Sequence, residues 1–256
     1  MKTNAIVRII VFSVLLICLT GVLLTGLGVG SYLVTDQIDV QTSSAHEFDP
    51  SQIRGIEIEW PADSVEVITA SVQCITVEQL HAETNNDAYV QVVNGVLKIK
   101  ESNSDSFIHF GSVSGNEQLT VTVPVGFKVG NLDIETASAD INITGIAAEE
   151  LELESASGNI NYEGQAANAS LNNASGHVNI VLFNTPLAIE AETASGNIDI
   201  TLPAASNFTA EVSTAIGKFE SEIPTTKVRN TYVAGLGSCR MELESASGNI
   251  RIHKGQ

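Results

Sequence analysis

The chain has 256 residues and carries 30 Asp and Glu against 12 Lys and Arg, a formal net charge of −18 at pH 7. Such an acidic surface repels nucleic acid and anionic lipid headgroups, which argues against binding to either. Hydrophobic residues make up 43% of the chain but aromatic residues only 5%, so aliphatic side chains must fill most of any core. A chain of this length can bury a large core.

An uncharged apolar segment lies near the N-terminus. It runs over 26 residues from Ile9 to Val34, long enough to cross a hydrocarbon core of roughly 30 Å with some tilt. Lys2 and Arg8 precede it, so the positive-inside rule predicts that residues 1–8 are cytoplasmic and that everything after Val34 lies outside. A cleaved signal peptide would have an apolar region of only about 7–15 residues. We therefore expect an uncleaved, single-pass signal anchor in the cell membrane.

The chain after this segment divides into a tether and one domain. Residues 35–52 are polar and show no periodicity, and we interpret them as the tether. Residues 53–256 contain short runs in which apolar and polar residues alternate, which is typical of half-buried strands. No shift in composition divides them, so we predict one extracytoplasmic all-β domain. The early runs are Ile56–Val67, Cys74–Val77, Tyr89–Val93, Val96–Ile99 and Leu119–Val123. Asn94-Gly95 predicts a hairpin between two of them.

A seven-residue phrase recurs through the rest of the chain. It reads Glu-Ser-Ala-Ser-Gly-Asn-Ile at Glu154–Ile160 and again at Glu244–Ile250. We call the place of its glycine the corner position. The copies put Ala139, Gly158, Gly176, Gly196, Gly217 and Gly248 there, in steps of 19, 18, 20, 21 and 31 residues. An earlier copy at Ile56–Val67 has Asp63 there, 76 residues or four steps of nineteen before Ala139. A period near twenty predicts a repeat architecture.

Apolar residues flank the corner position at fixed offsets: seven and five before it, and two and four after it. The inward parity changes across the phrase, so the chain must bend there, and a glycine able to take positive φ suits such a bend. Alanine stands two residues before the corner position in the six clear copies (Ala137, Ala156, Ala174, Ala194, Ala215 and Ala246), which predicts a tight inward corner.

Two short strands cannot bury their apolar face alone, so the copies must stack. We predict a β-solenoid, similar to a parallel β-helix, built from coils of about twenty residues. A β-sandwich of short strands is the alternative.

These features together resemble a known family. They are the N-terminal membrane segment, the I-x-I-x-W strand pair of Ile56–Val67, the V-x-V-P-x-G stretch of Val121–Gly126, and repeats of the form L-x-I-E-S-A-S-G-N-I. The chain is similar over roughly Ile53–His253 to the bacterial DUF4097 "putative adhesin" β-strand-repeat family. The resemblance implies a cell-envelope protein with a solenoid-like ectodomain. Members are described as adhesin-like, some are linked to envelope-stress responses, and the family offers no catalytic residues to carry over.

Motifs for catalysis or cofactor binding are absent from the sequence. It contains no G-x-S-x-G, S-x-x-K, CxxC, HExxH, P-loop or dinucleotide fingerprint. Only His177 of the five histidines lies in the phrase, where other copies carry Asp, Asn or Lys, so no serine is paired with a recurring base. We expect no enzymatic activity, no catalytic, cofactor-binding or metal-ligating residue, and no cofactor.

Carboxylates recur at two offsets. Six residues before the corner position stand Asp133, Glu152, Ser170, Glu190, Glu211 and Glu242. Four residues before it stand Glu135, Glu154, Asn172, Glu192, Ser213 and Glu244. Stacking would bring like charges within about 4.8 Å. Calcium could relieve the repulsion, but the glycine-rich nonapeptide loop of calcium solenoids is absent. The even spread favours a solvated, salt-screened face over a calcium site or a glycoside hydrolase.

Two structural expectations follow from the stacked coils. Partial amide ladders are predicted between coils at Asn159, Asn161, Asn179, Asn197 and Asn249. Cys74 and Cys239 should lie more than about 20 Å apart and form no disulfide, because several layers of about 4.8 Å separate them.

We therefore predict a membrane-anchored extracytoplasmic β-repeat protein of the bacterial cell envelope with an adhesin-like binding or structural role. Its partner would be a protein or a glycan at the cell surface, and not a nucleic acid. The alternative is an envelope-stress sensor or regulator. That role would need partners within the membrane, because only about eight residues lie on the cytoplasmic side.

Overall fold

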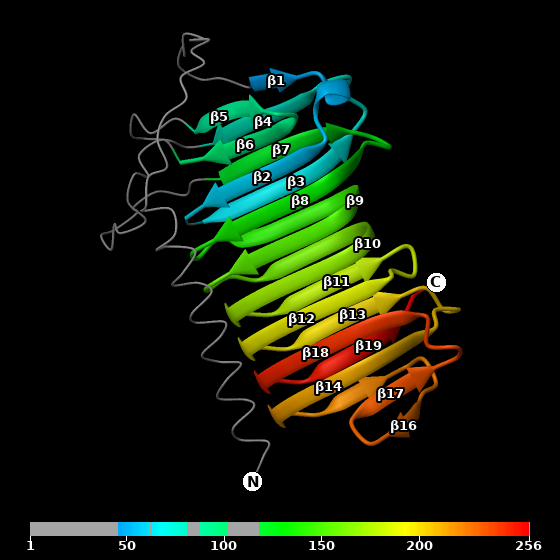
Figure 1. The fold of residues 1–256 in the computed structure, drawn as a ribbon. Coiled ribbons are helices and arrows are strands. Elements are labelled where there is room, and N and C mark those ends of the chain that lie inside the picture. Colours follow the sequence, from blue (N-terminus) through cyan, green and yellow to red (C-terminus); the bar gives the residue numbers. More distant parts are fainter. Residues whose placement is uncertain (1–45, 62, 81–87, 102–117, 256) are drawn as a thin grey trace.

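The computed structural model describes residues 46–61, 63–80, 88–101 and 118–255. The predicted anchor at residues 9–34 lies outside these ranges, and within them no helix has the length and apolar character needed to cross a membrane. Most of the described chain is strand, wound into a tall stack (Figure 1). The N-terminal elements are β1 (His46–Phe48), the 3-10 helix η1 (Pro50–Gln52), β2 (Gly55–Trp60), β3 (Ser64–Ala70), β4 (Ile75–Leu80), β5 (Tyr89–Val93), β6 (Val96–Lys100) and β7 (Gln118–Pro124).

The phrase-containing repeats form the remaining strands. These are β8 (Lys128–Thr136), β9 (Asp140–Ser155), β10 (Ile160–Ser175), β11 (Val178–Leu182), β12 (Ala188–Ser195), β13 (Ile198–Leu202), β14 (Phe208–Ile216), β15 (Phe219–Ser221), β16 (Thr226–Val228), β17 (Thr231–Ala234), β18 (Cys239–Ser247) and β19 (Ile250–Lys254). Each coil has a strand before its corner position and a strand after it. The strands before the corners pair with one another on one side of the stack, which we call the first sheet, and the strands after them pair on the other side, which we call the second sheet. The long strands β9 and β10 run through both, so all the described strands are connected by hydrogen bonds.

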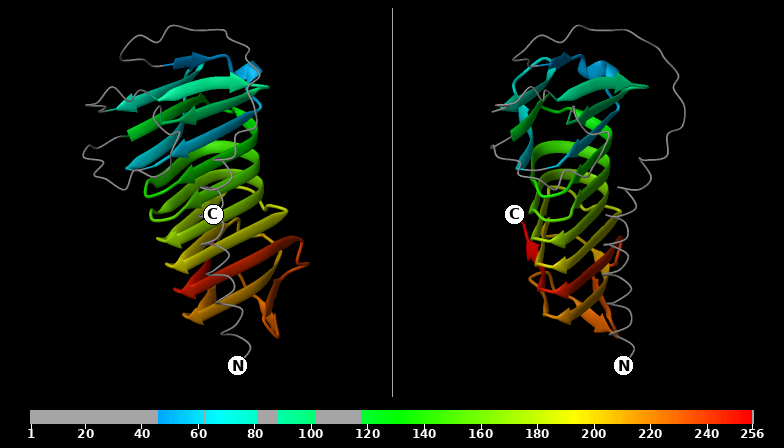
Figure 2. Two further views of the ribbon diagram at one scale, coloured as in Figure 1. Left: turned by 60° about the vertical axis from the view of Figure 1, so that its left-hand side comes forward. Right: turned by 90° about the vertical axis from the view of Figure 1, so that its left-hand side faces the viewer.

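Neighbouring coils pair in parallel with their corner positions aligned. Ile160 of β10 lies opposite Ile141 of β9 on one side and opposite Val178 of β11 on the other. The coils therefore lie one above another along a single axis (Figure 2). This parallel pairing confirms an all-β, solenoid-like fold and not the antiparallel sandwich that was the alternative.

The core consists of the apolar ladders that the sequence alternation predicts. Residues at the four inward offsets are buried in almost every copy, and only those of the β14–β15 coil (Val212, Phe219 and Ser221) are half-buried. The largest fully buried side chains include Trp60, Tyr162 and Phe208, and aliphatic residues fill most of the rest. The two-residue period on each side of the corner therefore specifies the interior.

The coils do not stack in chain order. The β2–β3 coil lies between the β6–β7 coil and the coil of β8 and the first part of β9. Asp63 and Ala139 are thus in adjacent layers, and the even division of their 76-residue separation into four steps is coincidental. At the other end the β18–β19 coil lies between β12–β13 and β14–β15. The long 31-residue step contains the β16–β17 hairpin, which precedes this return into the stack.

The corner glycines are required by close contact more than by positive φ. A Cβ on Gly196 would lie 2.7 Å from the carbonyl carbon of Gly176 and closer still to its oxygen. A Cβ on Gly248 or Gly158 would meet the corner carbonyl of its neighbour in the same way. Positive φ occurs at Gly176 (149°) and Gly196 (159°) but not at the other corner glycines. The positive φ that suits such a bend is therefore found at only two of the corner glycines, and Asp63, with φ of 67°, adopts the left-handed conformation.

The expectation that alanine forms the inward corner is wrong. Ala137 and Ala215 are exposed, and the other phrase alanines are half-buried. The residue one position earlier points inward, because it continues the odd-offset parity of the strand. In five copies this residue is buried and polar: Thr136, Ser155, Asn173, Thr193 and Ser245. Most of them donate to a corner carbonyl, as Asn173 Nδ2 does to Gly158 O at 2.6 Å. These donors satisfy carbonyls that would otherwise be buried without a partner.

The folded domain begins earlier than residue 53, so the tether prediction is too long at its C-terminal end. His46–Phe48 pairs antiparallel with β4, and Phe48 packs against the core. The Asp49 side chain then accepts from Ser51 N at 2.9 Å and caps η1.

The predicted hairpin is confirmed. β5 and β6 form an antiparallel hairpin whose turn residues Asn94 and Gly95 have φ of 53° and 81°. Cys74 and Cys239 are both free thiols, and Cys239 is buried at the start of the inserted coil.

Candidate binding face

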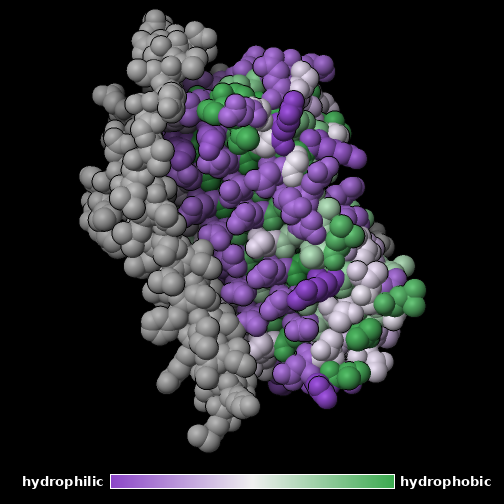
Figure 3. Space-filling view, in the orientation of Figure 1, coloured by the Kyte–Doolittle hydropathy of each residue, from purple (hydrophilic) through white to green (hydrophobic). Residues whose placement is uncertain are grey.

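Carboxylates line the outer surface of the sheet that contains β2, β8, β12 and β18. Strand pairing places them in register: Asp133 lies opposite Glu152, and Glu190 lies opposite Glu242. We call this surface the acidic face. Its carboxylates are Glu57, Asp133, Glu152, Glu190, Glu242 and Glu211 in one column, and Glu59, Glu135, Glu154, Glu192 and Glu244 in the other. Hydrophilic residues cover much of the described surface on the side that the space-filling view shows (Figure 3).

Few cations balance these columns. Lys98 on β6 bonds Glu57 at 2.6 Å, and Lys100 bonds Glu59, so the β2 end is neutralised. Within the described part of the face, the other ion pair is an exposed contact of 3.8 Å between Arg240 and Glu242. Exposed pairs of this kind contribute little stability. The rest of the described face therefore has few cations to balance its carboxylates.

The second column and half of the first are half-buried, in contrast to the solvated face that the sequence suggested, and the other carboxylates of the first column are exposed. Burial, followed by repulsion from Glu152, raises the pKa of Asp133 to about 7. Burial, followed by repulsion from Glu192, raises the pKa of Glu244 to about 7. Burial also raises the pKa of Glu135. Part of the face therefore holds protons near neutral pH, which lowers the repulsion between layers.

These shifted carboxyls predict how stability depends on pH. The pKa values of Asp133 and Glu244 are raised to about 7 from 3.8 and 4.5, so the folded chain binds more protons than the unfolded chain between about pH 4 and pH 7. Stability should fall as pH rises through that window. We expect a lower melting temperature at pH 8 than at pH 5, and a smaller difference for Glu244→Gln. A melting temperature that rises from pH 5 to pH 8 would contradict the raised values.

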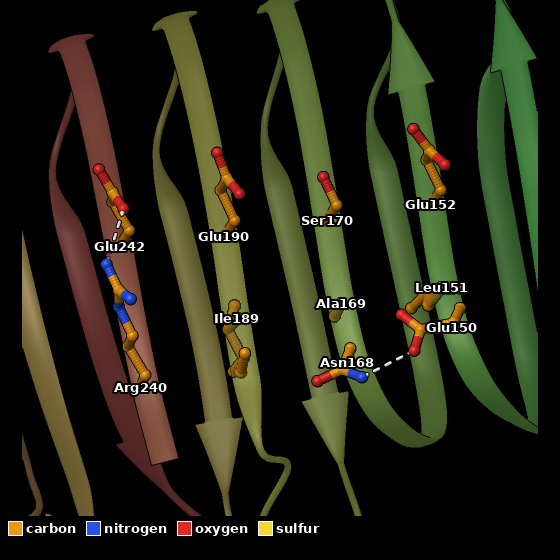
Figure 4. A pocket seen from close by; sticks show the side chains of 11 residues that line it. Glu150, Leu151, Glu152, Asn168, Ala169, Ser170, Ile189, Glu190, Arg240 and Glu242 are labelled. Carbon is orange, nitrogen blue, oxygen red and sulfur yellow. Dashed lines mark hydrogen bonds and ion pairs between the residues drawn. The ribbon is translucent and has the colours of Figure 1, made fainter.

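A shallow hollow of about 380 Å³ lies within the acidic face (Figure 4). Glu152, Glu190 and Glu242 stand in a row across it, with Ser170 in the same row as a gap in the charge. Its floor and rim add Glu150, Leu151, Asn168, Ala169, Ala188, Ile189 and Arg240. Asn168 Nδ2 donates to Glu150 Oε1 at 2.8 Å, which fixes one edge. The hollow offers carboxylate acceptors above the strand backbone, because the side chains of Leu151, Ala169 and Ile189 are buried in the core beneath it.

The predicted amide ladder is confirmed in part, and its form explains His177. Asp140 Oδ1 accepts from Asn159 N at 2.6 Å, and Asn159 Oδ1 accepts from His177 N at 3.0 Å. His177 Nδ1 accepts from Asn197 N at 3.1 Å, and Asn197 Oδ1 accepts from Asn249 N at 2.8 Å. Each side chain thus accepts the backbone N–H of the next coil. His177 has a structural role in this ladder.

Sequence reasoning identified the carboxylate columns but missed the hollow. Asn168 and Arg240 stand eight residues before their corner positions, an offset that carries no shared residue type. Within the described ranges, no group of three or more His, Cys, Asp or Glu side chains could hold a metal ion.

Comparisons with known proteins agree with this architecture. The family model described as Toastrack DUF4097 matches residues 125–253. A "putative cell adhesion protein" from Clostridium sporogenes has a TM-score of 0.55 at 10% identity, covering 84% of this chain and 99% of its own. A "putative adhesin" from Bacteroides fragilis has a TM-score of 0.40 at 12% identity, covering 83% and 98%. No curated protein matches the chain. The first of these structures shares the fold.

Proposed function

Because the chain belongs to the Toastrack DUF4097 family, we propose that it is an adhesin-like binding protein of the bacterial cell envelope. In this proposal residues 9–34 anchor it in the membrane, residues 1–8 stay in the cytoplasm, and the β-stack stands outside the cell. The ligand is a protein or glycan that carries positive charge. The fold shared with a structure described as a "putative cell adhesion protein" supports this role.

The acidic face is the observation that carries the proposal. Its carboxylates lie in register over many layers, and the hollow of about 380 Å³ gives a ligand a place to settle. A surface of one sign steers oppositely charged ligands and speeds their association. Hollows of this size suit a side chain or a sugar unit. The carboxylates are spread evenly and are not gathered around one reacting atom, so we propose binding without catalysis.

Intact, wall-stripped cells that make the full-length chain provide the test. We expect them to bind polylysine-coated beads over polyglutamate-coated beads, and high salt should weaken the binding. Glu152→Gln, Glu190→Gln and Glu242→Gln together should reduce binding roughly tenfold, since a total loss of about 1.4 kcal/mol suffices. The matched control replaces Glu47, Glu78 and Glu163, three exposed carboxylates outside the acidic face, by Gln.

Two results would contradict the proposal. Equal loss of binding in both triple variants would mean that net charge, and not the acidic face, recruits the beads. A β-stack fully protected from external protease would place the domain inside the cell.

A further inference from the structure

The C-terminal coil fills a gap one strand wide between two coils that precede it in the chain. β18 pairs with β12 on one edge and with β14 on the other. β19 pairs with β13 and β15 in the same way. The coils of β12–β13 and β14–β15 are both paired with this coil in the described fold. If the coil left its place, each of them would have an unpaired strand edge. We call this gap the slot. Open edges of this kind are templates for pairing with another strand.

Charge on the second sheet matches the coil to the slot. Arg251 lies between Asp199 of β13 and Glu220 of β15, at 3.4 Å and 3.8 Å. His253 contacts Asp199 at 3.0 Å and Glu222 at 3.5 Å. Both walls of the slot are therefore acidic, and the coil that fills it brings the cations. Stacking in chain order would instead place the Asp199 and Glu220 carboxylates in adjacent layers, where they repel.

The corner of the slot restricts its occupant further. Gly248 lies against the Gly196 carbonyl so closely that a Cβ would be 2.5 Å from the carbonyl carbon. Asn249 N donates to Asn197 Oδ1 at 2.8 Å, and Asn249 Oδ1 accepts from Lys218 N at 3.0 Å. The inward residues Met241, Leu243, Ile250 and Ile252 are buried. An occupant needs this glycine, this amide, these apolar positions and these cations together, and residues 239–254 carry all of them.

The segment that leads into the coil has the features of a hinge. Gly235 and Gly237 adopt φ of 56° and 69°, and Leu236 between them is 94% exposed. Asn207 fastens this turn by accepting from Leu236 N and from Cys239 N. Because the turn contributes little to the core, it can open while the coil keeps its own sequence pattern.

We propose that a second copy of this chain can insert its residues 239–254 into the slot, in exchange for the first copy's coil. In the resulting dimer each copy inserts its C-terminal coil into the slot of the other. Such an exchange forms a dimer at little free-energy cost, because each coil keeps the same contacts. Arg240 and Glu242 lie on this coil and line the hollow, so each hollow is then completed by the other copy. The exchange stands independently of the proposed adhesive function.

Cysteine cross-linking of co-expressed full-length chains tests the exchange. One copy carries Glu190→Cys and the other carries Glu242→Cys, each with its own tag. These positions are in register across the β12–β18 edge, within reach of a disulfide. After mild oxidation we expect a covalent dimer carrying both tags. Glu152→Cys with Glu242→Cys is the control, and it should yield about tenfold less, because two layers lie between.

A second pair, Glu192→Cys with Glu244→Cys, repeats the test in the other column. Single chains carrying both cysteines of a pair show that the variants fold and that the geometry permits the bond. Dimer above the control level at either pair supports the exchange. Internal bonds in the single chains, with no dimer above control at either pair, would overturn it.

Discussion

Replacing Gly196 by valine should lower the free energy of unfolding by about 3–5 kcal/mol, above the usual range of about 1–3 kcal/mol for overpacked sites. The added Cβ would lie 2.7 Å from the carbonyl carbon of Gly176, and backbone cannot rotate away as a side chain can. The valine branch adds further atoms to the same contact. Relief requires the two coils to separate, which breaks the parallel hydrogen bonds between β12 and β10.

Chemical denaturation of the isolated variant measures this loss. Ser195→Val is the matched control, because Ser195 precedes Gly196 and is exposed. It should change stability by no more than about 0.5 kcal/mol. If Gly196→Val unfolds at the same denaturant concentration as the control, the close contact at the corner does not exist.

Replacing Leu243 by alanine should cost about 2–5 kcal/mol, the usual range for a fully buried leucine. Leu243 is buried in the inserted coil, in register with Ala191 on one side and Val212 on the other. Alanine at Ala191 leaves room that the leucine fills, so truncation opens a cavity within the stack. Thermal unfolding should show the loss as a melting temperature lower by roughly 5–15 °C.

Comparing the stability loss of Val212→Ala with that of Leu243→Ala tests the order of the coils. Val212 stands in the same column but in the outermost coil, where it is half-buried, so its truncation should cost only about 1 kcal/mol. Stacking in chain order would make Val212 internal and Leu243 terminal. A larger loss at Val212 than at Leu243 would therefore contradict the inserted position of β18. Arg240→Ala, which removes an exposed side chain from β18, is the neutral control.

The architecture could be predicted from the sequence because each repeat has apolar residues at the same offsets from its corner position. Ile141 and Ile160 stand at the same offset in successive copies, and this alternation alone specifies which side chains point inward. The same parity extends to Ser155 and Asn173, although their polar character conceals it. The local period thus predicts the coil, the corner and the parallel stacking.

The order of the coils could not be predicted in this way. Every copy offers nearly the same apolar ladder and the same corner, so one coil can stack on almost any other. A few side chains outside the ladder distinguish the neighbours: Lys98 against Glu57 at one end, and Arg251 between Asp199 and Glu220 at the other. Aligning the repeats shows what they share and hides these charged pairs, so the alignment does not predict which coils are neighbours.

The burial of the carboxylates could not be predicted from the sequence either. Glutamate at an outward offset is usually exposed, but Asp133 and Glu244 lie against neighbours of their own kind that shield them from water. The degree of shielding depends on which coils are adjacent. The burial of the carboxylates on the acidic face therefore depends on the stacking order, which the sequence did not predict.

Internal cross-linking in single chains tests the stacking order on which this account rests. A chain with Glu190→Cys and Glu242→Cys should form an internal disulfide on mild oxidation, because these positions are adjacent across β12 and β18. A chain with Glu190→Cys and Glu211→Cys should not, since β18 lies between and two strand spacings amount to about 9.6 Å. Peptide mapping that finds a bond between positions 190 and 211, and none between positions 190 and 242, would show that the coils stack in chain order and would contradict the account.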